Sequence, residues 1–227
     1  MQNETSCRHF KFHKKHFTFH KKHLTKEHFT IMIVISNPVA VANEISLIHS
    51  LFEEGLALFH VRKPEFTEIE MMQFIEQIKP EFRSKLILHT QHQIADAFGI
   101  SKIHFSERER NQTLLFPIEN KTVSTSSHSI ADFNALDPSF EYAFLSPVFK
   151  SISKENYASE IDLFEAVKSR KNFRTKMIAL GGISPENSKT TLENGFDGIA
   201  LLGAIWNHEN PVNQFILCQK IVLTYSL

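Results

Sequence analysis

The chain has 227 residues, 42% of them hydrophobic, which suffices for one substantial core. The formal net charge is zero, but residues 1–31 carry seven basic and two acidic side chains, which leaves residues 32–227 with a net charge of −5. An acidic body gives no reason to expect a nucleic-acid partner, and two distant cysteines, Cys7 and Cys218, exclude a disulfide framework and fit a reducing cytoplasm.

Residues 1–31 repeat a theme of histidine, lysine and an apolar residue, as in the segments 13–18 and 20–25. No apolar run there is long enough for a signal peptide or a membrane span. The histidine pairs could hold a metal, and the basic-aromatic mixture could contact an acidic surface. We expect instead that this extension is disordered or lies upstream of the true start, and we assign it no function.

From Met32 onward, short apolar runs typical of strands alternate with stretches whose apolar residues recur at helical spacing. The predicted strands are 32–36, 57–62, 85–89, 102–105, 122–126, 142–146, 176–180 and 198–202. The predicted helices are 44–53, 67–78, 91–98, 161–169 and 185–194. The segment 107–120 contains Pro117 and little periodicity, so we expect a short helix there or none.

Strands that alternate with helices form parallel βαβ units, and eight such strands close into a barrel. No linker or shift in composition interrupts the chain after residue 31. The sequence therefore predicts the α/β class: a single (β/α)8 TIM barrel over residues 32–227, preceded by the 1–31 extension.

Glycine-containing turns follow the last two predicted strands, at Gly181-Gly182 and at Leu202-Gly203. Glycine lets backbone N–H groups approach a ligand, and the following helix N-terminus favours an anion. Glycine also makes tight turns without any ligand. Because two such turns come in succession at the end of a barrel, we interpret them as a phosphate site.

Chemistry in such barrels lies at the C-terminal ends of the strands. That rule selects the candidate residues His60, Arg62, Lys63, His89, Thr90, His104, Glu107, Glu109, Ser126, His128, Ser151, Ser153 and Lys154. The histidines lack the spacing of a known zinc motif, so we predict no metal site.

Six segments in order resemble motifs of the thiamine phosphate synthase/TenI superfamily, over residues 32 to about 221. Phe59-His60-Val61-Arg62-Lys63 resembles its Q/H-x-R-E-K segment, which holds a pyrophosphate or a carboxylate. The segments 102–107, 126–129 and 145–154 resemble G-x-H-x-G-Q, S-x-H-S/T and G-P-I/V-F-x-T-x-T-K. The two glycine turns resemble A-I-G-G-I and G-A-D-G. The resemblance implies a barrel enzyme of thiamine biosynthesis.

The chain departs from the synthase branch at the pyrophosphate end. That branch has N-D after strand 3 and G-Q-E-D after strand 4, and the two aspartates bind magnesium. Here the corresponding residues are His89-Thr90 and Glu109, and Pro64 replaces the lysine of R-E-K. Loss of a carboxylate removes a hard oxygen ligand of magnesium. The thiazole-phosphate end keeps its candidate donors: Ser151, Ser153, Gly182, Leu202 and Gly203.

The resemblance thus implies a TenI-like thiazole tautomerase that binds thiazole carboxylate phosphate and needs no cofactor. His128 is the candidate acid/base, with capping of the next helix as its alternative, and Arg62 would anchor the carboxylate. The other expected substrate contacts are His60, Lys63, His89, Ser126 and Lys154. The alternatives are a divergent magnesium-dependent thiamine phosphate synthase and a non-catalytic binder of thiazole phosphate. We expect no nucleic-acid or membrane partner, and a homo-oligomer stays open.

Overall fold

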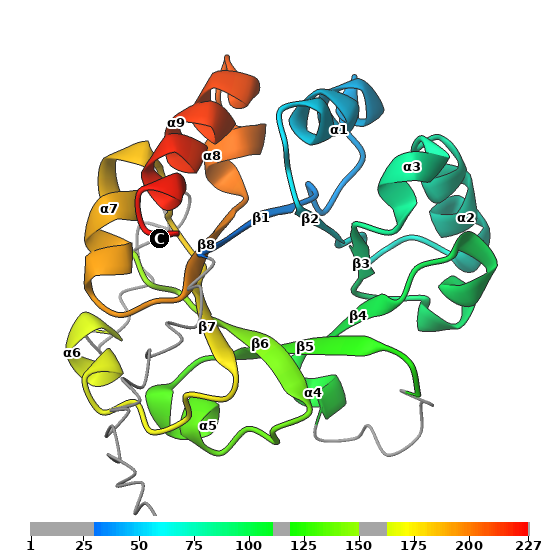
Figure 1. Cartoon of the computed structure of the whole chain (residues 1–227). Coiled ribbons are helices and arrows are strands. Elements are labelled where there is room, and N and C mark those ends of the chain that lie inside the picture. The colour runs from blue at the N-terminus through cyan, green and yellow to red at the C-terminus, as the bar shows by residue number, and fades with distance from the viewer. Residues whose placement is uncertain (1–29, 111–118, 150–162, 227) are drawn as a thin grey trace, which may run out of the picture.

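The computed structural model describes residues 30–110, 119–149 and 163–226. Its strands run parallel, each hydrogen-bonded to the next, and β8 (Gly198–Leu201) pairs with β1 (Ile31–Ile35) to close the ring. Helices surround this ring (Figure 1). The predicted single TIM barrel is confirmed.

The strands lie within about two residues of their predicted positions. Between β1 and β8 come β2 (Leu58–Val61), β3 (Leu86–Leu88), β4 (Lys102–Phe105), β5 (Thr122–Ser127), β6 (Phe140–Leu145) and β7 (Lys176–Ala179). The first strand starts at Ile31, one residue before its predicted start. Thr30 precedes it and contacts the C-terminal segment: its backbone N donates to Ser226 Oγ (3.2 Å), and its Oγ1 donates to the carbonyl of Tyr225 (2.9 Å).

The helices match the prediction less evenly. The described helices are α1 (Glu44–Glu53), α2 (Glu68–Glu76), α3 (Pro80–Arg83), α4 (Glu107–Arg110), α5 (Ile130–Asn134), α6 (Leu163–Val167), α7 (Pro185–Glu193), α8 (Gly203–Trp206) and α9 (Pro211–Leu223). The predicted helix 91–98 is instead two 3-10 turns, η1 (His92–Ile94) and η2 (Asp96–Phe98). Helix α9 was not predicted, although Asn210 caps it and Pro211 opens it, both of which are helix-start signals.

The barrel interior is apolar on one side and polar on the other. Ile33, Tyr142, Phe144, Ile178 and Ala200 belong to one buried interior cluster. Facing them, β2, β4 and β5 supply the buried polar residues His60, His104 and Ser124. Both histidine rings lie about as close to Phe144 as packed aromatic rings do, with centroids 4.9 and 5.0 Å from its ring. The polar half of the interior is where the candidate site begins.

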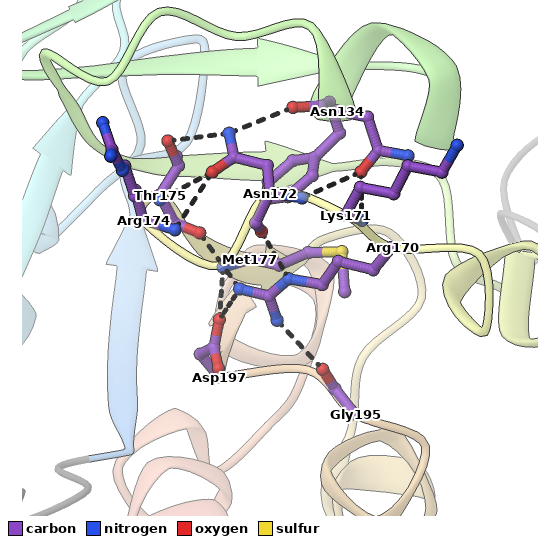
Figure 2. A network of polar contacts seen from close by, with 10 residues as sticks. Asn134, Arg170, Lys171, Asn172, Arg174, Thr175, Met177, Gly195 and Asp197 are labelled. Carbon is purple, nitrogen blue, oxygen red and sulfur yellow. Dashed lines mark hydrogen bonds and ion pairs between the residues drawn. The ribbon is translucent and has the colours of Figure 1, made fainter.

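At the N-terminal end of the strands, Asp197 ties β7 and β8 to the segment before them (Figure 2). Its Oδ2 accepts hydrogen bonds from Arg170 Nη2 and from the Met177 backbone N, both at 2.7 Å. Arg170 Nη2 also donates to the Thr175 carbonyl at 3.0 Å. The aspartate of the Gly195-Phe196-Asp197-Gly198 segment therefore stabilises the barrel at the end opposite the candidate site.

We expect Asp197→Asn to lower the free energy of unfolding by about 1.5–3 kcal/mol, because both hydrogen bonds lose their charged acceptor. Urea unfolding followed by circular dichroism measures this difference. Glu141→Gln, on an exposed residue, is the matched control and should change the value by no more than about 0.5 kcal/mol. Equal stability of the Asp197 variant and the wild type would contradict a structural role for this carboxylate.

Candidate active site

Three histidines that are far apart in the chain meet at the C-terminal ends of neighbouring strands. His60 lies on β2, His89 follows β3 and His104 lies on β4. His60 Nδ1 is 2.8 Å from His89 Nε2, and His60 Nε2 is 2.7 Å from the hydroxyl of Tyr142. The ring centroids of His89 and His104 are 4.2 Å apart.

Two serines of β5 extend this group of polar contacts inside the barrel. His104 Nδ1 is 2.9 Å from Ser124 Oγ, and its Nε2 is 3.0 Å from Ser126 Oγ. Burial lowers the pKa of His104 to about 3, and it also lowers the pKa values of His60 and His89 well below the ordinary value. All three imidazoles are therefore neutral at neutral pH. Sequence reasoning weighed them with other histidines as a group and found no metal-motif spacing, but it did not bring these three into contact.

His128 lies above this cluster, exposed at the end of β5. Its Nδ1 is 2.9 Å from the carbonyl oxygen of Ser146. A carbonyl only accepts, so Nδ1 carries the proton and the neutral ring presents the lone pair of Nε2. Glu107 Oε2 lies 3.7 Å from that Nε2. This arrangement suits a group that takes up a proton and returns it.

His128 does not cap α5, because Ser129 fills that position and its side chain accepts from the backbone N of Asp132 at 3.1 Å. Together with Ser106, Glu107 and Arg108, His128 lines a surface hollow at the ends of β4 and β5. The alternative role of His128 as a helix cap is therefore wrong.

Arg110, which the sequence analysis did not name, holds this corner in place. Its Nη1 donates to the carbonyl of Ser126 at 2.8 Å, and its Nη2 pairs with Asp132 Oδ1 at 2.7 Å. The contacts join α4, β5 and α5. Because they connect residues 16 and 22 positions apart in the chain, no local sequence signal announces them.

Arg62 is exposed at the end of β2, as an anion-binding arginine would be. Two hydrogen bonds to Ser36 hold its backbone in place: its N donates to Ser36 Oγ at 2.8 Å, and its carbonyl accepts from the same hydroxyl at 3.0 Å. The guanidinium charge contributes to lowering the pKa values of His89 and His104. Arg62 and the histidine cluster therefore share one region of the barrel mouth.

The structure does not bring Lys63 to this mouth. Its side chain is fully buried, and Nζ lies 2.6 Å from one carboxylate oxygen of Glu44 and 2.9 Å from the carbonyl of Val39. Burial lowers the pKa of Lys63 and raises the pKa of Glu44, and their mutual attraction opposes both changes. Lys63 joins α1 to β2, which corrects its expected place among the ligand contacts.

Glu109, at the position of the second family aspartate, caps its own helix. Its Oε2 accepts from the backbone N of Ser106 at 2.8 Å and from its hydroxyl at 2.6 Å, and Ser106 Oγ accepts from the Glu109 backbone N. The pattern Ser106-x-x-Glu109 is a capping box that the sequence already displays. At the other aspartate position, Thr90 Oγ1 is buried and has no hydrogen-bond partner among the described residues.

The two glycines after β7 have different reasons to be glycine. Gly181 has φ +101°, and a Cβ there would lie 2.9 Å from Pro147 Cα, so this residue lets the loop after β7 pack on the loop after β6. Gly182 is exposed with φ +65°, and its carbonyl accepts from Asn187 Nδ2 at 2.8 Å. Of the two glycines, Gly182 is the exposed one.

The turn after β8 is held against β1. Leu202 precedes α8, which starts at Gly203 and ends at Trp206, whose Nε1 donates to the Ile35 carbonyl at 2.6 Å. A Cβ on Gly203 would meet its nearest neighbour, Asn207 Nδ2, at 3.6 Å, an ordinary contact. Ser151, Ser153 and Lys154 lie outside the described residues.

The fold, the order of the strand-end residues and the two glycine turns agree with one family. A family model described as thiamine monophosphate synthase matches residues 31–205. The chain belongs to this family. The thiamine-phosphate synthase of Anoxybacillus flavithermus is 24% identical over 83% of this chain and 91% of its own length.

Solved structures of the family resemble the chain throughout the barrel. Thiamine phosphate pyrophosphorylase from Bacteroides thetaiotaomicron is 26% identical, with a TM-score of 0.68 over 84% of this chain and 96% of that one. The pyrophosphorylase from Pyrococcus furiosus shares the fold at 17% identity and a TM-score of 0.69, covering 87% and 97% of the two chains. Family membership supports a role in thiamine biosynthesis. No helix in the described part of the chain is long and apolar enough to cross a membrane.

Proposed function

We propose that the chain is a thiazole phosphate tautomerase that converts thiazole carboxylate phosphate to its aromatic isomer. That reaction needs a group that removes a proton and returns it, and anchors for a carboxylate and a phosphate. The observation that carries the proposal is His128, whose Nδ1 is 2.9 Å from the Ser146 carbonyl and whose Nε2 faces outward beside Glu107. One imidazole can perform both transfers.

The residues that would bind the carboxylate and the phosphate belong to the same end of the barrel. Arg62 is exposed at the end of β2 and would hold the carboxylate through its guanidinium. Gly182, Leu202 and Gly203 would hold the phosphate with backbone N–H groups, together with Ser151, Ser153 and Lys154. His89 and Ser126 would line the floor of the pocket, with His60 beneath them.

The residues at the synthase positions favour the tautomerase over coupling chemistry. Glu109 caps α4, Thr90 offers a hydroxyl where a carboxylate would stand, and Lys63 pairs with Glu44. A departing pyrophosphate would meet few groups able to neutralise it. The second candidate is a divergent magnesium-dependent thiamine phosphate synthase, which the names of the relatives favour.

The experiment that separates the two gives purified full-length protein each substrate set. We expect tautomerisation of thiazole carboxylate phosphate at the same rate with EDTA and with added magnesium. We expect little thiamine phosphate from pyrimidine diphosphate and thiazole phosphate. Efficient magnesium-dependent coupling would overturn the proposal in favour of the synthase, and tight binding without turnover of either would make the chain a binder.

The phosphate anchor is tested most cleanly at Gly203. Because a Cβ fits there, Gly203→Val should fold normally and crowd only the ligand. We expect thiazole phosphate to bind about 10–150-fold more weakly by calorimetry, the equivalent of one lost hydrogen bond to a charged group.

The control is Gly99→Asn, at a glycine with φ +67° and open space around its Cβ, next to the start of β4 at the opposite end of the barrel. It should bind as the wild type does. Undiminished binding by Gly203→Val, with an unchanged melting temperature, would place the phosphate elsewhere.

A further inference from the structure

The histidine cluster described above is not used by the proposed proton transfer, and its geometry has a further consequence. One ring nitrogen from each of His60, His89 and His104 lies within 4.8 Å of the others. The three residues come from successive strand ends, and the closed barrel holds those ends side by side. Three imidazole nitrogens gathered this closely can form the ligand set of a transition-metal site.

The groups around the cluster orient the rings as outer ligand partners do. Tyr142 OH is 2.7 Å from Nε2 of His60, which leaves Nδ1 of that ring directed at His89. Ser124 Oγ is 2.9 Å from Nδ1 of His104. Metal-bound histidines characteristically use their second nitrogen in such a contact, which selects the tautomer and fixes the ring.

The distances suit an ion after a small movement. Zinc binds imidazole nitrogen at about 2.0–2.1 Å, so tetrahedral ligand atoms stand about 3.3 Å apart. His60 Nδ1 and His89 Nε2 are 2.8 Å apart and would separate slightly, with the His89 ring turning out of its stacking on His104. His89 is half-buried while the other two are buried, so this ring is the one with room to turn.

We propose that His60, His89 and His104 bind one first-row divalent metal ion of the zinc type, with the fourth position directed toward the barrel mouth beside Ser126. Imidazole suits zinc, nickel or copper, whereas magnesium takes oxygen ligands. All three ligands are neutral, so the ion keeps its full charge. Binding of the ion through Nε2 of His104 would release Ser126 Oγ, which now lies 3.0 Å from that nitrogen, to hydrogen-bond a water or an anionic group on the ion.

The test uses the full chain and compares stoichiometries, because the six histidines of residues 1–29 will also take up metal. Metal-free protein is titrated with Co²⁺, followed by visible absorption, and then with Zn²⁺ in a calorimeter. We expect the wild type to bind one equivalent more than His89→Gln, and to show the intense visible bands of four-coordinate Co²⁺ that this variant lacks. His49→Gln, on the outer helix α1, is the matched control and should behave as the wild type.

Two further variants keep the test decisive. His104→Gln should also bind one equivalent of metal less than the wild type. If this buried substitution prevents folding, the His89→Gln variant, at a half-buried residue, still decides the result. Tyr142→Phe keeps the ring and removes only the hydroxyl, so Zn²⁺ should bind about 10–100-fold more weakly. Equal stoichiometry and equal spectra for the wild type and His89→Gln would overturn the proposal and leave the cluster as a hydrogen-bonded core of neutral imidazoles. Because the readout is metal bound rather than turnover, this outcome is independent of whether the tautomerase assay succeeds.

Discussion

Replacing His128 by alanine should slow tautomerisation by about 10²–10⁴-fold, the usual contribution of a positioned general acid/base. The Nε2 of this imidazole lies at the ends of β4 and β5, 3.7 Å from Glu107 Oε2. Its side chain is 62% exposed, so its removal should not disturb the core. Steady-state kinetics with thiazole carboxylate phosphate measures the change, which should fall on kcat and leave KM nearly as it was.

His49→Gln is the control for the loss of a histidine elsewhere on the barrel. This residue lies on α1, where its Nε2 accepts from the backbone N of Lys79 at 3.2 Å, an acceptor role that glutamine retains. Its activity should match the wild type. A His128→Ala enzyme that retains more than about a tenth of the wild-type kcat would show that another group transfers the proton.

Replacing Lys63 by methionine should lower the free energy of unfolding by about 3–5 kcal/mol, because it leaves a buried carboxylate without its partner. The two side chains are 0% and 4% exposed, and their charged atoms are 2.6 Å apart. The affinity for thiazole carboxylate phosphate should not change in the fraction that stays folded. Chemical unfolding and calorimetry at low temperature measure the two quantities separately.

The double variant Lys63→Met/Glu44→Leu distinguishes the ion pair from the cavity left by a shortened side chain. Removing both charges should recover most of the lost stability, since a buried ion pair replaced by apolar groups of similar size is often neutral. If Lys63→Met instead kept full stability and lost ligand binding, Lys63 would be a ligand contact and its pairing with Glu44 incidental.

Much of the fold could be read from the chain because its information is local. Alternating strand and helix patterns give parallel units, and eight of them in succession are typical of a closed barrel. Helix starts are local as well: the Ser106 to Glu109 capping box was legible and explains the carboxylate at the family's metal position. The helix expected at 91–98 divides into η1 and η2, because Gln91 and Gly99 both take left-handed backbone conformations and only seven residues lie between them.

Some residues of the candidate site could be found from the sequence, and others were placed there only by the tertiary structure. By itself, the sequence determined the barrel, the end of the strands where chemistry lies, and His128 and Arg62 as residues at that end. The tertiary structure alone decided that Lys63 turns to Glu44, 19 residues earlier, and that His60, His89 and His104 face one another across three strands. The reason is physical: a strand pattern says which face a side chain takes, but the neighbours it meets there depend on the register between strands and the curvature of the closed sheet.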